Sequence, residues 1–275
     1  MSDCNSCALN NGCSKNKEQC MIENNPLNNV KKVIGVMSGK GGVGKSSISV
    51  IIAKYLKELG YNVGILDADI TGPSIPRLLG LSDKKAGSYN EMILPAENSD
   101  GIKVMSLNLL MENEEDPVIW RGPIISGMVK QFWTDVVWGE LDYLVIDMPP
   151  GTGDVALTVM QSMPISGVVM VSVPQDLVSM IVSKAVNMAK KMNINVLGVI
   201  ENMSYITCAK CGEKTKLFEG EGTEKFLKEM NLKLLGELPM IKSISNLSQY
   251  GDEKIDESLE LIFDPIIKGI INELG

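Results

Sequence analysis

Gly39-Lys40-Gly41-Gly42-Val43-Gly44-Lys45-Ser46 is the stretch of sequence that decides the fold of this chain. It fits the pattern G-x-x-x-x-G-K-[ST], in which small residues let successive backbone N–H groups turn inward around a phosphate. In this pattern Lys45 reaches the outer phosphates, and the hydroxyl of Ser46 holds magnesium. The stretch therefore predicts that the chain binds a nucleoside triphosphate.

The segments on either side of this stretch have the order that the motif requires. An apolar segment of strand length, 32–38, precedes it, and the segment 46–59 after it has apolar residues at helical spacing. Strands and helices are expected to alternate along the rest of the chain, with strands at 61–66, 92–94, 102–107, 141–147, 167–173, 196–200 and 232–238, and helices at 177–192 and 223–230. This alternation predicts the three-layer α/β fold of P-loop NTPases, a mostly parallel sheet with helices on both faces.

Composition sets limits on the class of protein. The chain has 275 residues, of which 44% are hydrophobic, enough for one large domain with an appendage. Its net charge of -8 argues against binding of nucleic acid, which needs a basic face. No basic region followed by an apolar core opens the chain, and prolines interrupt the uncharged segment 155–175 that a membrane span would use. We therefore expect a cytoplasmic protein that binds neither a membrane nor nucleic acid.

The six cysteines fall into two clusters, and the first lies in a polar N-terminal arm over residues 1–30, ahead of a main domain over 31–275. Because histidine is absent, a soft-metal site must be held mainly by thiolates. Four thiolates in one short arm can close an iron–sulfur or a zinc site, and redox-active thiols are the third possibility. The candidate ligands in the arm are Cys4, Cys7, Cys13 and Cys20.

The second cluster is the C-x-x-C pair Cys208 and Cys211. Such a pair can bring both sulfurs to one metal or cluster, but a [4Fe–4S] cluster or tetrahedral zinc requires four ligands. A two-fold dimer would supply the second pair of thiolates on its axis. A zinc knuckle within one chain is the alternative.

Three aspartates follow apolar strands near the expected phosphate site. Asp147 ends its strand, where a carboxylate typically holds magnesium through water, although a simple turn residue is the alternative. Asp67 and Asp69 follow the strand after the phosphate loop, and one of them can orient an attacking water. We favour Asp69, and a capping or turn role is the alternative for either. An ordinary phosphate loop has no need of a second lysine at the position of Lys40. A second cation in so tight a turn requires an anionic partner.

At this point the sequence resembles a known group of proteins. Lys40-Gly41-Gly42-Val43-Gly44-Lys45-Ser46-Ser47 is similar to the deviant Walker A loop of the MinD/ParA/nitrogenase-reductase group of dimeric ATPases. Within that group, the segments 67–74, 120–123, 147–154 and 201–204 are together similar to the Mrp/ApbC iron–sulfur carrier ATPases. The resemblance covers the chain from Lys31 to its end.

The resemblance implies roles for individual residues. Lys40 would cross a dimer interface to the partner's nucleotide, Lys45 would bind the outer phosphates, Ser46 magnesium and Asp69 the attacking water. Asn202 would contact the adenine, although the residues alone favour a loop residue that caps a turn. The whole loop from Gly39 to Ser47 would surround the ATP.

For the cysteines, the resemblance implies that Cys208 and Cys211 hold a labile bridging cluster. Cys4, Cys7 and Cys13 are similar to part of the N-terminal cluster motif of eukaryotic scaffold relatives. Their further upstream cysteine is missing here, and Cys20 would have to replace it.

These observations predict a homodimeric ATPase that slowly hydrolyses ATP with Mg²⁺, takes a [4Fe–4S] cluster from a donor and passes it to apo-proteins. An electron-transfer ATPase of the nitrogenase-reductase type is one alternative, although its cluster ligands come from separate loops. A MinD- or ParA-like positioning ATPase with structural zinc is the other. The C-terminal segment 258–274 speaks against a membrane-bound version, because its only cation is Lys268.

Overall fold

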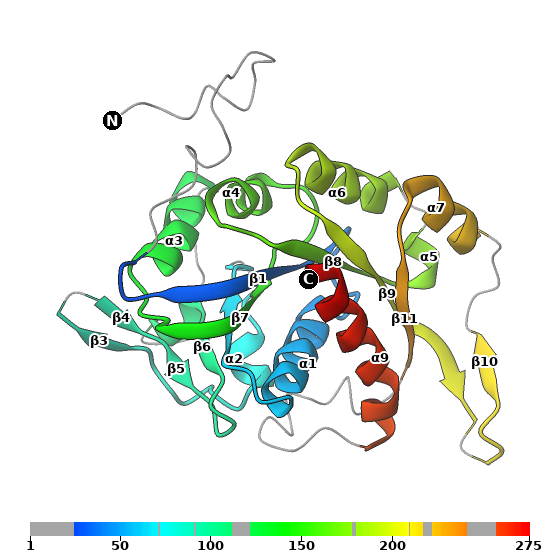
Figure 1. Cartoon of the computed structure of the whole chain (residues 1–275), viewed down its shortest axis with the longest axis horizontal. Helices are drawn as coiled ribbons and strands as arrows, with labels where there is room; N and C mark the ends of the chain where they lie inside the picture. The colour runs from blue at the N-terminus through cyan, green and yellow to red at the C-terminus, as the bar shows by residue number, and fades with distance from the viewer. Residues whose placement is uncertain are drawn as a thin grey trace.

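The computed structural model describes residues 25–70, 72–90, 92–111, 122–177, 180–208, 210–216, 222–240 and 257–275. Over these ranges the chain forms an α/β fold in which helices cover both faces of a mixed sheet (Figure 1). Its strands are β1 Asn29–Ser38, β2 Val63–Asp67, β3 Gly87–Tyr89, β4 Met92–Leu94, β5 Ala96–Glu97, β6 Lys103–Met105, β7 Glu140–Asp147, β8 Gly167–Ser172, β9 Val196–Thr207, β10 Lys214–Lys216 and β11 Leu234–Pro239. Its helices are α1 Lys45–Glu58, α2 Ile75–Leu78, the 3₁₀ helix Leu107–Leu109, α3 Gly122–Thr134, α4 Asp154–Ser162, α5 Pro174–Leu177, α6 Met180–Lys191, α7 Gly222–Met230 and α9 Glu257–Leu274.

The main sheet has nine strands among the described residues, in the order β10-β9-β8-β1-β7-β2-β6-β5, with β11 also paired to β9. The strands from β9 to β6 are parallel, and β11 is parallel to β9. The two end strands, β5 and β10, run antiparallel to their neighbours. Because β1 lies between β7 and β8, its carboxyl end and the phosphate loop that follows lie in the middle of the sheet.

Two hydrophobic cores lie on the two faces of the sheet, because a central parallel strand has to be covered on both sides. The first core includes α1, α2 and α9, and the second includes α3, α4, α6 and α7. In Figure 1, α1 and α9 lie on one side of the sheet, and α3, α4 and α6 on the other. This arrangement confirms the predicted three-layer fold.

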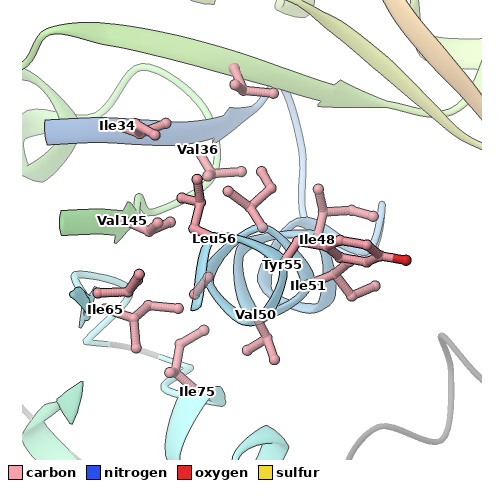
Figure 2. Packing of buried hydrophobic residues seen from close by; sticks show 14 of the residues in the cluster. Ile34, Val36, Ile48, Val50, Ile51, Tyr55, Leu56, Ile65, Ile75 and Val145 are labelled. Atoms are coloured by element: carbon pink, nitrogen blue, oxygen red, sulfur yellow. The ribbon is translucent and has the colours of Figure 1, made fainter. Parts of the chain in front are cut away.

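Helix α1 carries the phosphate loop into the first core. Its apolar residues recur at positions that share a face, and almost the whole helix is buried because α9 and α2 cover the sides that the sheet leaves open. Figure 2 shows Leu56 beside Val36 and Val145 of the sheet, and Val50 directed toward Ile75 of α2. The ring of Tyr55 stacks on Phe263 of α9, with 5.8 Å between centroids.

Two of the boundaries that differ from the sequence prediction concern β9 and the start of the folded domain. The predicted strand over 196–200 continues to Thr207 in β9, because β11 and then β10 provide further pairing partners. The folded domain begins before Lys31: Asn25 and Asn28 are buried, and their side-chain amides donate to the carbonyls of Thr134 and Val136, both at 2.9 Å. The short strands β3, β5 and β10 contain only two or three residues, too few for a hydrophobic pattern.

A search of the described residues for a bilayer-spanning helix finds none with the required length and apolar character. Helix α9, the C-terminal segment with one apolar side, instead packs that side against β11 and α1.

Candidate nucleotide and metal sites

The phosphate loop joins β1 to α1, and glycine is required at two of its positions. Gly42 has φ +80° and Gly44 has φ +84°, in the left-handed region that favours glycine. At Gly44 a Cβ atom would also lie 2.3 Å from Nδ2 of Asn202. The same amide nitrogen donates to the carbonyl oxygen of Val43 at 2.9 Å, so β9 holds the loop from outside.

Lys45 is the first residue of α1 and is 6% exposed. Its Nζ lies 2.8 Å from Oδ2 of Asp147 and 3.9 Å from Oδ2 of Asp69. The short contact is an ion pair, and among the residues that the structure describes the ammonium makes no hydrogen bond with favourable angles. A buried ammonium with unsatisfied donors suits a phosphate oxygen, so this residue fits the predicted nucleotide.

Asp147 ends β7 and is fully buried. Its Oδ2 accepts a hydrogen bond from the hydroxyl of Ser46 at 2.7 Å, and its Oδ1 accepts one from Ser49 at 2.7 Å. The structure thus brings together Lys45, Ser46 and Asp147, which the sequence analysis predicted to share one site. A carboxylate beside a hydroxyl is the hard oxygen set that Mg²⁺ prefers, so these side chains fit that ion.

Ser49 is a contributor that the sequence analysis missed. It lies four residues after Lys45, one turn further along the same face of α1, and it is completely buried. Its hydroxyl contacts both the Lys45 carbonyl, at 3.1 Å, and the Asp147 carboxylate. Helical spacing from the motif lysine was the available signal.

The structure separates the two aspartates that follow β2. Asp67 is buried, and its carboxylate accepts hydrogen bonds from the backbone N–H groups of Asp69, Ser74 and Ile75 and from the hydroxyl of Ser106. Burial, followed by the charge of Asp147, raises the pKa of Asp67 to about 7. Asp67 therefore ties down the loop that follows it, whereas Asp69 places its carboxylate near Lys45.

Lys40 lies in the same loop and is exposed. The side chain of Ser38, at the end of β1, donates to the carbonyl oxygen of Lys40 at 2.9 Å, which fixes the backbone at this point. The Lys40 side chain thus lies at the surface of the phosphate loop.

Cys208 and Cys211 lie in the turn between β9 and β10, and both are exposed. The N–H of Cys208 donates to the carbonyl of Glu213, and the N–H of Gly212 donates to the carbonyl of Cys208, both at 2.9 Å. The backbone N–H groups of Cys211 and then Lys210 stabilise the Cys208 thiolate and lower the pKa of Cys208 below its ordinary value. The turn therefore favours the thiolate form of Cys208, which is the form that binds metal.

No group of three or more metal-ligating side chains occurs within the ranges that the structure describes, so this pair of cysteines is alone there. Figure 1 shows the β9–β10 hairpin extending away from the body of the molecule. The arm cysteines Cys4, Cys7, Cys13 and Cys20, and Arg121 of the 120–123 segment, lie outside the described residues.

The two candidate sites share one strand. Asn202, which contacts the phosphate loop, and Cys208, at the tip of the hairpin, are six residues apart on β9 and in the turn directly after it. An extended chain advances about 3.3 Å per residue, so the two residues are at most about 20 Å apart. β9 is thus a direct covalent connection between the loop and the cysteine pair.

Comparisons with known proteins agree with this geometry. The family model ParA, described as NUBPL iron-transfer P-loop NTPase, matches residues 29–274. An iron–sulfur cluster carrier protein from Clostridium perfringens is 48% identical over 272 residues, 95% of each chain. A nucleotide-binding protein from Archaeoglobus fulgidus, solved in complex with ADP, is 43% identical with a TM-score of 0.71 over 81% of this chain and 87% of that one.

The cell division ATPase MinD from Pyrococcus furiosus is 19% identical with a TM-score of 0.60, over 88% of this chain and 98% of that one, and is alike in fold. The comparisons confirm the predicted fold and the predicted resemblance to carrier ATPases.

Proposed function

The chain belongs to the family of NUBPL iron-transfer P-loop NTPases, and from this membership we propose that it is an ATP-dependent carrier of [4Fe–4S] clusters. It would take a cluster from a donor, hold it on Cys208 and Cys211, and pass it to apo-proteins. One observation carries the proposal: an exposed cysteine pair ends the strand that also contacts the phosphate loop. The name of the relative from Clostridium perfringens supports the same function.

In the nucleotide site, the loop from Gly39 to Ser47 would bind ATP, with Lys45 on the outer phosphates. Ser46 would hold Mg²⁺ directly and Asp147 would hold it through water; bound there, the ion neutralises charge that develops on the phosphates. Asp69 would orient the attacking water, since its carboxylate lies 3.9 Å from the Lys45 ammonium. Hydrolysis would be slow and coupled to cluster carriage.

Asn202 would contact the adenine while its amide keeps the Val43 carbonyl in place. The exposed position of Lys40 supports a contact with the nucleotide of a second subunit, in a homodimer. In such a dimer each active site is complete only when the partner is present. Binding and hydrolysis of ATP would then change how the two subunits meet.

The cluster is the cargo of this protein. Each chain contributes two thiolates within its described part, and a [4Fe–4S] cluster needs four ligands, so two hairpins would meet on the dimer axis. The strand that joins Asn202 to Cys208 would transmit a change at the nucleotide to the hairpin. The arm cysteines would hold a second iron–sulfur cluster or zinc.

The test uses the full-length chain in which all four arm cysteines are replaced by serine, so that only the hairpin thiols remain. After anaerobic reconstitution with iron and sulfide, we expect about four irons per dimer and a broad charge-transfer absorption in the visible. Cys208→Ser should abolish this absorption and leave ATP binding intact, because the phosphate loop lies at the end of another strand.

The reconstituted chain should also activate an apo [4Fe–4S] enzyme, whereas Cys208→Ser should not. If the same protein held one zinc per chain and transferred no iron, the carrier function would be wrong. The structural-zinc ATPase considered at the outset would then replace it.

A further inference from the structure

The β9–β10 hairpin has two chemically different faces. On one face lie Tyr205, Lys214 and Lys216: the Lys214 ammonium sits 4.6 Å from the centroid of the Tyr205 ring, and Tyr205 pairs with Lys216 across the strands. Lys216 in turn forms an ion pair with Glu237 of β11 at 3.2 Å. The positive charges of the two strands are therefore engaged on this face by neighbours in the same chain.

The opposite face carries the first cysteine and two exposed apolar side chains. Side chains alternate along a strand, so Ile206 shares its face with Cys208, two residues further on. The N–H of Met240, the residue directly after β11, donates to the carbonyl of Tyr205 at 2.8 Å, which places Met240 at the level of Ile206 on β9. Ile206 is 44% exposed and Met240 is 54% exposed. We call these two side chains the apolar ledge.

The position of the apolar ledge indicates what covers it. The cysteine pair next to it supplies two thiolates, and the proposed function takes the other two ligands of the cluster from a second copy of the chain. In a two-fold contact the same surface of both copies forms the interface. The apolar ledge of one copy would then pack against that of the other, and the two cysteine pairs would face each other. The face that carries Lys214 and Lys216 points away from such a contact, so like charges are not brought together.

We infer that the apolar ledge, Ile206 with Met240, is the contact between two copies of this chain that seals a cluster held by their hairpins. The inference rests on the proposed function, because it takes the bridging cluster as given, and adds the residues that exclude water from it. Exclusion of water by apolar side chains slows the entry of solutes that compete for iron. The apolar ledge thus governs how long the cluster is retained before transfer.

The test starts from the full-length chain with serine at all four arm positions, reconstituted with iron and sulfide. Two changes alter the apolar ledge, Ile206→Ser and Met240→Gln, and Ile206→Leu keeps it apolar. Leu59→Ser is the matched control, since Leu59 is also about half exposed, at 52%, but lies at the far end of α1. Two quantities are measured: the rate of iron release to a ferrous chelator, and the mass of the iron-loaded species by sedimentation.

We expect Ile206→Ser to release iron about tenfold faster than the parent and to shift the loaded protein toward monomer. The cause is that one large apolar side chain is no longer buried in the contact. Met240→Gln should act in the same direction. Ile206→Leu and Leu59→Ser should behave like the parent. Thermal unfolding of the iron-free proteins should be unchanged in all four, because each side chain is exposed.

The outcomes separate this inference from the proposed function. If the parent itself holds no iron on its hairpin thiols, the proposed function fails and the inference falls with it. If the parent forms the iron-loaded dimer but Ile206→Ser and Met240→Gln match it in both measurements, only the inference is overturned. If these variants match it but transfer less iron–sulfur cluster to an apo enzyme, the apolar ledge is a surface for recipients, and the inference is again wrong.

Discussion

The phosphate loop and the cysteine hairpin lie at the two ends of one stretch of β9, yet they are built in opposite ways. The side chains around the loop are almost fully buried, with Lys45 6% exposed, Asp147 0% and Asn202 1%. The cysteines are exposed, and backbone hydrogen bonds of their own turn hold them. A nucleotide site can thus be formed largely within one chain, whereas the cysteine site depends on what approaches it from outside.

The largest effect is expected when the buried charge of the phosphate loop is removed. Lys45→Ala should weaken ATP binding by about 2 to 5 kcal/mol, because it removes a desolvated charge contact to phosphate and leaves Asp147 without its ion-pair partner. Calorimetry measures the loss, with Lys191→Ala as the control, since Lys191 is an exposed lysine in the last turn of α6. Unchanged affinity in Lys45→Ala would remove this lysine from the nucleotide site.

A smaller effect is expected from the backbone of the loop. Gly44→Ala should lower the free energy of unfolding by about 1 to 3 kcal/mol, since φ is +84° and the new methyl group would meet Asn202. Gly41→Ala is the matched control, because a Cβ there meets nothing within 4 Å. Denaturant unfolding of both variants without nucleotide measures the difference. Equal stabilities would mean that the loop is not held by β9 as the structure indicates.

The smallest expected effect is on the reactivity of Cys208 in the hairpin. The N–H groups of Cys211 and Lys210 lower the pKa of Cys208 below its ordinary value of 9.0, so a larger fraction of this thiol is thiolate in the folded chain. Below pH 9 the metal-free protein should therefore alkylate Cys208 faster than the denatured chain does at the same pH. Mass spectrometry after brief iodoacetamide treatment measures both rates.

As the pH rises above 9, the advantage of the folded chain should shrink, because the thiol is ionised in both states. Equal rates for folded and denatured protein at pH 7 to 8 would contradict the stabilisation of the thiolate by the turn.

The sequence predicted the loop, Lys45, Ser46 and Asp147 correctly as neighbours, because a short motif and a strand end specify them by local spacing. It did not predict that β9 continues to Thr207. Its buried polar residues Glu201 and Ser204 interrupt the apolar pattern, and in the sheet the Ser204 hydroxyl donates to the Glu201 carboxylate at 2.8 Å. The sequence analysis favoured Asp69 over Asp67 for the attacking water, but only the structure shows that Asp67 binds the backbone of the loop that follows it.

The sequence by itself therefore determined the fold class, the phosphate loop and the presence of a cysteine pair, because each depends on residue types within a short distance along the chain. The tertiary structure decided which groups meet: Ser49 with Asp147, Asn202 with the Val43 carbonyl, and Asp67 with the loop after it. It also decided that Met240, through the bond from its N–H to the Tyr205 carbonyl, lies at the level of Ile206 on β9. Such contacts join strands that are distant in sequence, and the order of strands in the sheet, which the local pattern does not specify, brings them together.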